Sequence, residues 1–233
     1  MKLSVVIPVY NEKNTILECL NKVEDVDLGA IEKEIIIIDD GSTDGTREIL
    51  KTIESKYRVI YHEKNQGKGM AIRNGFGAAK GDVILIQDAD LEYNPLNYPM
   101  LIKPILEDRA DVVYGSRFLN KDFRHISLSF YLGNKFLTIF SNLLTGLNLT
   151  DMETCYKVFS KKALDEILPH LTAKRFEIEP ELTARISQKR HRFLEVGLSF
   201  IGRSRTHKEG KKINWKDGLA AMRYMIKFNL FSR

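Results

Sequence analysis

Short apolar runs recur along the first half of the chain, and each ends in polar residues or glycine. They cover residues 3–9, 34–38, 57–61, 83–86 and 111–114. Helix-like segments alternate with them at residues 13–23, 46–55, 70–80 and 94–107. Apolar runs without polar alternation are typical of strands buried on both faces, and strand–helix alternation is typical of a parallel sheet. The pattern therefore predicts a doubly wound, mostly parallel α/β sheet with flanking helices.

Length and charge limit what such a chain can do. With 233 residues, of which 43% are hydrophobic, the chain can build one large α/β domain. The formal net charge of +5 favours an anionic partner such as a phosphate-rich ligand, a nucleic acid or an acidic membrane surface. Cys19 and Cys155 have no metal-binding spacing and are predicted to be free thiols.

Three carboxylates follow the apolar run at residues 83–86. They are Asp88, Asp90 and Glu92. Carboxyl ends of parallel strands are where open α/β sheets bind ligands, and hard oxygen groups suit Mg²⁺ or Mn²⁺ held with a diphosphate. The alternative is a solvated acidic turn.

A second acidic turn follows the run at residues 34–38. Asp39 begins the segment 39–45, in which Gly41 and Ser42 lead toward a helix. A carboxylate at this position can accept hydrogen bonds from a ribose or a base, which predicts a nucleoside site. Helix capping by Ser42, Thr43 or Asp44 is compatible with that function.

Two basic residues are predicted to face the same edge of the sheet. Lys68 lies in Asn-Gln-Gly-Lys-Gly, which lacks P-loop spacing and is typical of a helix start. From there Lys68 can reach a phosphate or a base. Arg117 follows the run at residues 111–114 and can clamp a phosphate bidentately. Gly75 and Gly77 are expected to allow close packing of the intervening helix.

Two later segments are predicted to be amphipathic helices. Residues 128–147 combine large apolar side chains with a polar stripe, which argues against a membrane-spanning helix and leaves a core-covering or an interfacial helix. Residues 215–231 form a basic amphipathic pattern, and residues 202–212 are strongly basic. Further helices are expected at 160–168 and 178–189 and a strand at 193–201.

Taken together, the motifs resemble glycosyltransferase family 2, whose members are inverting enzymes with a nucleotide-diphosphosugar (GT-A) fold. The resemblance is carried by residues 6–12, 39–46, 65–69, 81–82, 88–90 and 115–117. Within the family the chain is similar to the dolichol-phosphate mannose synthase branch. Glu92 stands where that branch often has Gln, and Glu-Gly-Lys-Lys at 209–212 replaces Gly-Glu-Ser-Lys.

The resemblance implies roles for individual residues. Catalysis is assigned to Asp88, Asp90 and Arg117, and the divalent ion, Mg²⁺ or Mn²⁺, to Asp90 and Glu92. The implied nucleotide-sugar contacts are Pro8, Val9, Tyr10, Glu12, Asp39, Gly41, Ser42, Lys68, Asp88, Ala89 and Asp90. The implied phosphate and acceptor contacts are Arg117, Lys157, Arg203, Arg205 and Lys211.

The expected reaction is transfer of a hexose, with GDP-mannose as first choice of donor, to a polyprenyl or dolichyl phosphate. Residues 1–212 are expected to form the catalytic domain, and residues 213–233 a helix that belongs to it or anchors it on a membrane surface. The expected location is the cytoplasmic membrane face, without a spanning helix, with a possible membrane subunit and no nucleic acid.

Two alternatives stay open. One is a transferase that uses UDP-glucose or UDP-N-acetylglucosamine, or a hydroxyl acceptor, for which Asp151 or Glu153 would supply the base. The other is a non-catalytic nucleotide-sugar binding module.

Overall fold

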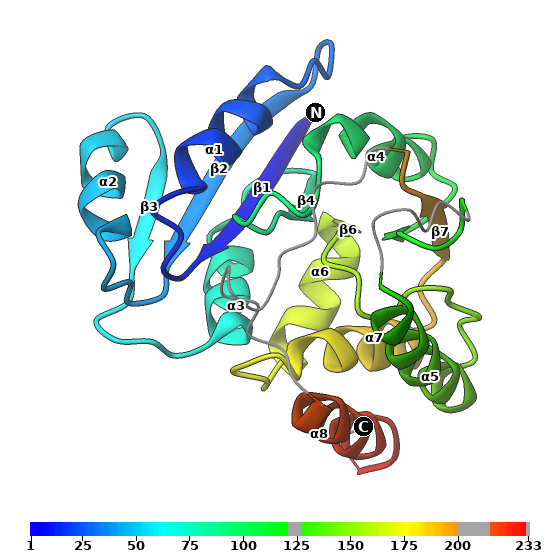
Figure 1. Ribbon diagram of the computed structural model, residues 1–233. Helices are drawn as coiled ribbons and strands as arrows, with labels where there is room; N and C mark the ends of the chain where they lie inside the picture. The colour runs from blue at the N-terminus through cyan, green and yellow to red at the C-terminus, as the bar shows by residue number, and fades with distance from the viewer. Residues whose placement is uncertain (121–126, 200–214, 232–233) are drawn as a thin grey trace.

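The computed structural model describes residues 1–120, 127–199 and 215–231 (Figure 1). Within them, strands and helices alternate along the chain up to the end of β5, as the apolar pattern predicts. Among the helices of these ranges, none combines the length and the apolar character that crossing a bilayer requires.

The strands of the described residues form one 7-stranded sheet in the order β3-β2-β1-β4-β6-β5-β7. Their bounds are β1 (Lys2–Val9), β2 (Glu32–Asp39), β3 (Arg58–Tyr61), β4 (Val83–Ile86), β5 (Val112–Ser116), β6 (Lys157–Ser160) and β7 (Phe193–Gly197). β6 runs antiparallel to β4 and β5, and the other pairs are parallel. The predicted mostly parallel sheet is confirmed, whereas β6 was not predicted because its apolar run is too short to stand out.

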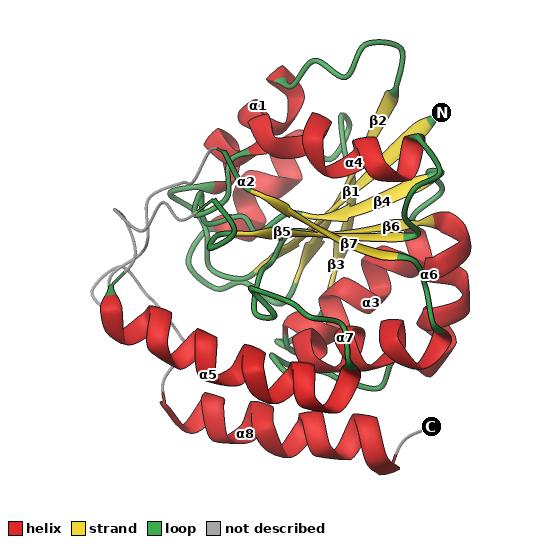
Figure 2. Ribbon diagram, turned by 90° about the vertical axis from the view of Figure 1, so that its right-hand side faces the viewer, coloured by secondary structure: helices red, strands yellow, loops and turns green. Residues whose placement is uncertain are grey.

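Helices cover both faces of the sheet. They are α1 (Ile16–Asp25), α2 (Thr46–Ile53), α3 (Lys68–Ala78), α4 (Tyr98–Leu106) after a 3₁₀ turn (Pro95–Asn97), α5 (Leu128–Thr145), α6 (Lys161–Ile167) before a 3₁₀ turn (Leu168–His170), α7 (Ile178–Lys189) and α8 (Trp215–Ile226), which ends in a π-helical turn (Lys227–Phe231). α1 and α4 lie on one face, and α3, α6 and α7 on the other (Figure 2). α5 and α8 lie side by side as an outer layer against α7.

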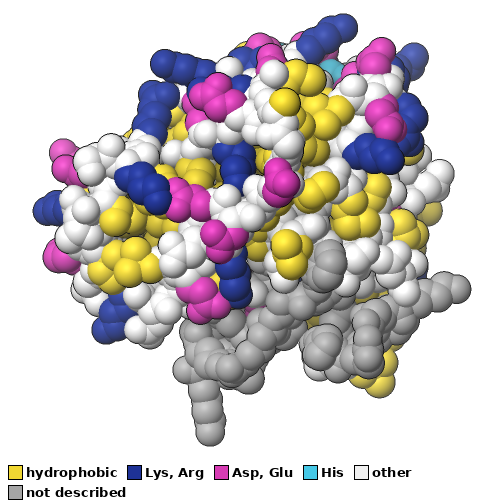
Figure 3. Space-filling view, turned by 90° about the horizontal axis from the view of Figure 1, so that it is seen from above, with side chains coloured by type: hydrophobic (Ala, Val, Ile, Leu, Met, Phe, Trp, Pro, Cys, Tyr) yellow, Lys and Arg dark blue, Asp and Glu magenta, His cyan; other side chains and the backbone are white. Residues whose placement is uncertain are grey.

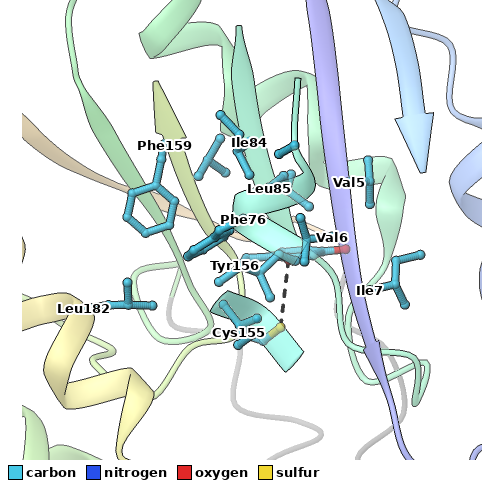
Figure 4. Close-up of a cluster of buried hydrophobic side chains, with 14 of the residues drawn as sticks. Val5, Val6, Ile7, Phe76, Ile84, Leu85, Cys155, Tyr156, Phe159 and Leu182 are labelled. Carbon is cyan, nitrogen blue, oxygen red and sulfur yellow. Dashed lines mark hydrogen bonds between the residues drawn. The ribbon is translucent and has the colours of Figure 1, made fainter. Parts of the chain in front are cut away.

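The core between the sheet and α3 is packed tightly (Figure 4). The rings of Phe76 and Phe159 meet edge to face at 5.6 Å between centroids. Gly75 lets α3 approach β1, since a Cβ there would lie 2.3 Å from Val6 Cγ1. The expectation for Gly77 was wrong, because an added Cβ would meet nothing within 4 Å.

α5 turns its polar stripe inward. Asn134, Thr138 and Ser141 are buried, whereas Leu132, Phe136 and Leu143 expose 57%, 59% and 79% of their surface. Leu137, Phe140 and Leu144 are partly buried and also pack against the core, so α5 covers the core with its polar stripe and with part of its apolar surface. The rest of its apolar surface is exposed, which is unusual for a surface helix.

The end of the molecule opposite to α5 and α8 carries charges of both signs. On the face that bears the amino end of β1, Lys and Arg side chains are interspersed with Asp and Glu (Figure 3). The charge excess of the chain is therefore not gathered into a basic patch on this face.

Candidate active site at the carboxyl edge of the sheet

Sheet topology brings most of the predicted site residues to one edge. β2, β1 and β4 are adjacent and parallel, so residues 39–42, 8–12 and 88–92 follow neighbouring strand ends. Arg117 follows β5, which lies beyond the antiparallel β6. The edge between β1 and β4 is thus lined by both predicted acidic turns.

The turns after β1 and β2 are joined by hydrogen bonds. The Asn11 amide donates to Ser42 Oγ at 2.9 Å, and Asn11 Oδ1 accepts from the Thr43 amide at 2.8 Å. The Glu12 amide donates to Thr46 Oγ1 at 2.8 Å. The two segments predicted to hold the nucleoside therefore form one rigid unit.

Asp39 is buried and paired with a residue that the sequence did not single out. Its Oδ2 accepts from Arg47 Nε at 2.6 Å, and its Oδ1 accepts from the Ser42 amide at 3.1 Å. These bonds hold the Asp39 carboxylate in a fixed orientation. Its predicted contact with the nucleoside stays a prediction.

Asp40 fixes the loop that leads into α3. It accepts from the amides of Gln66 and Gly67, both at 2.8 Å, and its Oδ1 lies 2.7 Å from His62 Nδ1. Gly41 has a φ of +76°, and a Cβ there would lie 2.6 Å from the Asn65 amide nitrogen. The strand-end carboxylate next to Asp39 therefore positions the loop that carries Lys68.

The start of α2 is held by a local turn rather than by a capping side chain. Asp44 Oδ1 accepts from the Thr46 amide at 3.0 Å, but the N-cap residue is Gly45, which has no side chain to cap the helix. The predicted capping by Ser42, Thr43 or Asp44 was therefore wrong, because the helix begins only at Thr46.

Lys68 bridges two carboxylates. Its Nζ lies 2.9 Å from Asp88 Oδ1 and 3.2 Å from Glu179 Oε1 on α7. Burial alone would lower the pKa of Lys68, but these carboxylates outweigh it and raise that pKa well above its ordinary value. Burial likewise opposes ionisation of Asp88, and Lys68 more than compensates, so the pKa of Asp88 is lowered. Both groups are charged at neutral pH.

A buried polar platform supports the turn that carries Asp88. Gln87 Oε1 accepts from Tyr98 and Tyr156 hydroxyls at 2.7 and 2.9 Å, and Gln87 Nε2 donates to the Asp88 carbonyl at 2.8 Å. The Tyr93 hydroxyl accepts from the Cys155 amide at 3.0 Å. Gln87 was not predicted as functional, because its bonds to Tyr98 and Tyr156 in the core can be seen only in the folded structure.

Asp90 and Glu92 lie partly exposed beyond this platform. Asp90 Oδ1 accepts from the Glu92 amide at 3.0 Å, which holds the turn compact. In the described ranges, no three His, Cys, Asp or Glu side chains form a metal-binding group. Two carboxylates fit Mg²⁺ or Mn²⁺ that also binds substrate phosphates, since such ions need few protein ligands.

Arg117 already holds a carboxylate. Its Nε and Nη2 donate to Asp151 at 2.7 and 2.8 Å, and its guanidinium lies 5.2 Å from the ring centroid of Phe130. Burial opposes the charge, but Asp151 raises the pKa of Arg117 above its ordinary range. The predicted phosphate clamp stays a prediction, and it would have to use the remaining donors of the guanidinium.

Lys157 is fully buried on β6. Its ammonium donates to the Met152 carbonyl at 3.2 Å and makes shorter contacts with the Thr154 carbonyl and Glu179 Oε2. Contact between Lys157 and a phosphate would require it to give up one of these oxygens. Its predicted role in binding the acceptor therefore stays untested, and its observed role is to hold residues 152–154 against α7.

The segment between Asp151 and Lys157 contains one further carboxyl group, Glu153. Burial, and then the charge of Glu179, raise the pKa of Glu153 from 4.5 to about 7. Its Oε1 is enclosed and has no hydrogen-bond partner among the described residues. Arg203, Arg205 and Lys211, predicted to bind phosphate, lie outside those residues.

The fold and the residues at this edge define a nucleotide-sugar glycosyltransferase of the GT-A type. Residues 4–168 match the model of Glycosyl transferase family 2. The chain belongs to this family, as its motifs predicted.

Two relatives are named for a transferase activity. The chain is 33% identical over 192 residues to the UDP-N-acetylglucosamine–dolichyl-phosphate N-acetylglucosaminyltransferase of Methanococcus voltae, covering 74% of this chain and 75% of that protein. It is 38% identical over 121 residues to the dolichol-phosphate mannosyltransferase of Pyrococcus furiosus, covering 51% of this chain and 34% of that protein.

The fold is also similar to a solved structure. Glucosyl-3-phosphoglycerate synthase from Mycobacterium tuberculosis, crystallised with Mn²⁺, UDP and phosphoglyceric acid, superposes with a TM-score of 0.72 at 22% identity. The match covers 97% of this chain and 76% of that chain. At this identity the likeness concerns the fold alone.

Proposed function

We propose that the protein transfers a hexose from a nucleotide diphosphate to a polyprenyl phosphate at a membrane surface. The observation that carries the lipid acceptor is the exposed apolar side of α5. Its polar stripe bonds to the protein, whereas Leu132, Phe136 and Leu143 face outward. An exposed apolar helix face of this kind is stable where it contacts lipid.

The inward side of α5 reaches the segment next to Glu153. Asn134 Nδ2 donates to Asp151 Oδ1 at 3.1 Å, and Thr138 Oγ1 accepts from the Met152 amide at 3.2 Å. One helix thus touches the site on one side and presents leucine and phenylalanine on the other. A lipid acceptor needs this arrangement, because its phosphate must reach the site while its tail stays in the bilayer.

α8 extends the apolar face and adds positive charge. Leu219 and Leu230 are more than half exposed, whereas Met225 and Phe228 pack inward. Within residues 128–145 and 218–231, the charged residues are Lys135, Arg223 and Lys227. A face with cations and no anions in these ranges complements an anionic leaflet.

A phosphate acceptor also suits the chemistry of the site. A phosphate monoester is largely dianionic at neutral pH, since its second pKa is near 6, so its oxygen can attack the anomeric carbon without a general base. The new bond joins that oxygen to the anomeric carbon, the bond to the nucleotide diphosphate breaks, and the configuration inverts. Asp90 and Glu92 would hold the divalent ion, whose charge stabilises the departing diphosphate.

The relatives suggest two donors. The Methanococcus protein is named for UDP-N-acetylglucosamine and the Pyrococcus protein for mannose. GDP-mannose, our first choice from the motifs, therefore competes with UDP-N-acetylglucosamine, whose relative matches over more of both chains.

A donor panel tests the proposal. The protein is incubated with Mg²⁺ or Mn²⁺, a polyprenyl phosphate in anionic vesicles and radiolabelled GDP-mannose, UDP-N-acetylglucosamine or UDP-glucose. We expect label to enter the organic phase from one donor, and a chelator to abolish the transfer. Nucleotide release without organic-phase label would contradict a lipid acceptor.

A hydroxyl acceptor is the second candidate, and one observation favours it. Asp151 accepts hydrogen bonds from Arg117, whereas Glu153 has an enclosed carboxyl oxygen without a partner in the described ranges. Under this alternative Glu153 would remove the hydroxyl proton. Activity would then rise with pH through about 7.

A further inference from the structure

Glu153 lies in a backbone segment that is fixed on both sides. The Met152 amide donates to Thr138 Oγ1 at 3.2 Å on α5, and Thr154 Oγ1 donates to the Gly115 carbonyl at 2.5 Å on β5. These bonds fix the position of the backbone from which the Glu153 side chain extends. Its Oε1 is nevertheless shielded from solvent without a hydrogen-bond partner in the described part of the chain.

The other charged groups around Glu153 form ion pairs with one another. They form two pairs of opposite charge, Lys157 with Glu179 and Arg117 with Asp151. Glu179 also contacts Lys68, which is itself paired with Asp88. Glu179 faces Glu153 from α7, Lys157 from β6, Arg117 from the turn after β5, and Asp151 from its own segment. Glu153 is the carboxyl group that remains after this pairing. Its negative charge would be uncompensated, so the neutral acid is favoured.

A neutral carboxyl group can form a hydrogen bond that the ionised carboxylates near it cannot form. It keeps one O–H donor, whereas an ionised carboxylate only accepts hydrogen bonds. The oxygens of a phosphate dianion accept hydrogen bonds and repel negative charge. A partly buried neutral acid beside cations therefore suits a phosphate, and an ionised one does not.

We propose that Glu153 is an acceptor-binding residue whose neutral carboxyl group donates a hydrogen bond to a phosphate oxygen of the polyprenyl phosphate. This inference rests on the proposed function, because it takes the acceptor to be a lipid monophosphate. It assigns Glu153 to the acceptor rather than to proton removal.

The proposal fixes the direction of the pH dependence. Glu153 must be protonated to donate, so affinity for the dianionic acceptor is greatest between about pH 6 and 7 and falls as the pH rises above about 7. Well above pH 7 the affinity for the acceptor falls about tenfold per pH unit, because binding is then coupled to the uptake of one proton. A general base would give the opposite slope.

Calorimetry with farnesyl phosphate tests the contact without relying on turnover. Binding is measured at pH 7.5 in buffers of different ionisation enthalpy, which reports proton uptake. About a quarter of Glu153 is protonated in the free protein at this pH, so the wild type should take up about three quarters of a proton on binding. Glu153→Gln should bind without proton uptake and keep its affinity up to pH 8.5, because the amide remains a donor.

Binding of farnesyl phosphate is also measured for Glu153→Ala and for a control variant. Glu153→Ala should bind about tenfold more weakly at pH 6.5, as expected when a hydrogen bond to a charged group is lost. Glu107→Gln, which removes a carboxylate at the end of α4, should behave as wild type. The inference is overturned if the wild type does not bind farnesyl phosphate, if it binds without proton uptake, or if Glu153→Ala binds as tightly as wild type.

Transfer assays on the same variants separate this inference from the proposed function. Binding with Glu153-dependent proton uptake but no lipid product would overturn the proposed reaction and leave the contact standing. A loss of about 10²-fold in turnover for Glu153→Gln at every pH, with wild-type activity rising through pH 7, would identify a base and overturn the contact.

Discussion

At the scale of single residues, the carboxyl edge of the sheet is organised by charge pairs that hold one another in place. Lys68 contacts both Asp88 and Glu179, and Lys157 contacts Glu179 from the other side. Breaking a buried pair leaves an uncompensated charge, which costs several kcal/mol. The pairs therefore keep Asp88 ionised and oriented before any ligand arrives.

Asp90 provides the most direct test of the metal site. We expect Asp90→Ala to lower turnover by about 10²-fold or more, because the diphosphate would lose a principal electrostatic stabiliser as it departs. Turnover is measured with saturating Mg²⁺ and Mn²⁺. Asp165→Ala on α6 removes an exposed carboxylate and serves as control. Turnover near that of wild type in Asp90→Ala would rule out Asp90 as a metal ligand.

Glu153 also predicts a pH dependence of stability. The folded state holds the Glu153 proton up to about pH 7, whereas the unfolded chain releases it near 4.5. Folding therefore binds a proton between these values, and the contribution of Glu153 to stability falls as the pH rises through that window. Glu153→Gln should raise the free energy of unfolding at pH 8 by up to about 3 kcal/mol and leave it nearly unchanged at pH 4.5.

Urea unfolding at pH 4.5 and pH 8 measures this difference. Glu107→Gln, which removes an exposed ion pair, should show no such gain at pH 8. Parallel stability curves for Glu153→Gln and wild type would mean that Glu153 is ionised in the folded protein at neutral pH.

The sequence identified site residues by type and position but not by partner. Asp39, Asp88 and Asp90 were predictable because each follows an apolar strand. The partners of Arg117 and Lys157 were not predictable, since Asp151 and Glu179 come from distant segments that only the fold brings near. Glu179 carried no local signal, because one glutamate at the start of a helix is ordinary.

At the scale of secondary structure, the start of α3 is fixed by backbone packing. The Met70 amide donates to the Lys174 carbonyl at 2.9 Å, so residues 173–175 lie directly over the first turn of the helix. Glu181 holds this loop by accepting from the amides of Thr172 and Ala173. The loop before α7 thereby keeps Lys68 near Glu179.

Two glycines of α3 provide a matched test of this contact. A Cβ at Gly69 would lie 2.8 Å from the Ala173 carbonyl oxygen, whereas a Cβ at Gly77 would meet nothing within 4 Å. We expect Gly69→Ala to destabilise the protein by about 1–3 kcal/mol through overpacking. Gly77→Ala should stabilise it by up to about 1 kcal/mol through helix propensity. Urea unfolding measures the free energy of unfolding of both variants. Equal changes in the two would contradict the close approach of residues 173–175 to the first turn of α3.

Secondary structure was predictable where the apolar pattern is long. β1, β2 and β4 follow from it, whereas β6 does not, because residues 157–160 offer only two large apolar side chains between polar ends. Periodicity also revealed that α5 is two-sided. It could not reveal which side faces the protein, since that depends on Asp151 and the Met152 amide, which bind the polar stripe.

At the scale of the whole molecule, the outward faces of α5 and α8 predict binding to anionic membranes. Placing one leucine side chain in lipid gains about 1.5–3 kcal/mol, and each nearby Lys or Arg adds about 1 kcal/mol. We therefore expect the protein to float with anionic vesicles and less with neutral ones. High salt should weaken binding, because it screens Lys135, Arg223 and Lys227.

Single substitutions distinguish binding through the exposed apolar face of α5 and α8 from non-specific adsorption to vesicles. Leu143→Ser should weaken vesicle binding about tenfold or more, since the leucine is 79% exposed and its removal leaves the core intact. Leu17→Ser removes a leucine that is 47% exposed on α1, across the sheet from α5, and should change nothing. Equal binding by both variants would place the membrane contact elsewhere. Retained donor binding by Leu143→Ser, with transfer lost only to vesicle-embedded acceptor, would show that α5 serves the lipid rather than the sugar nucleotide.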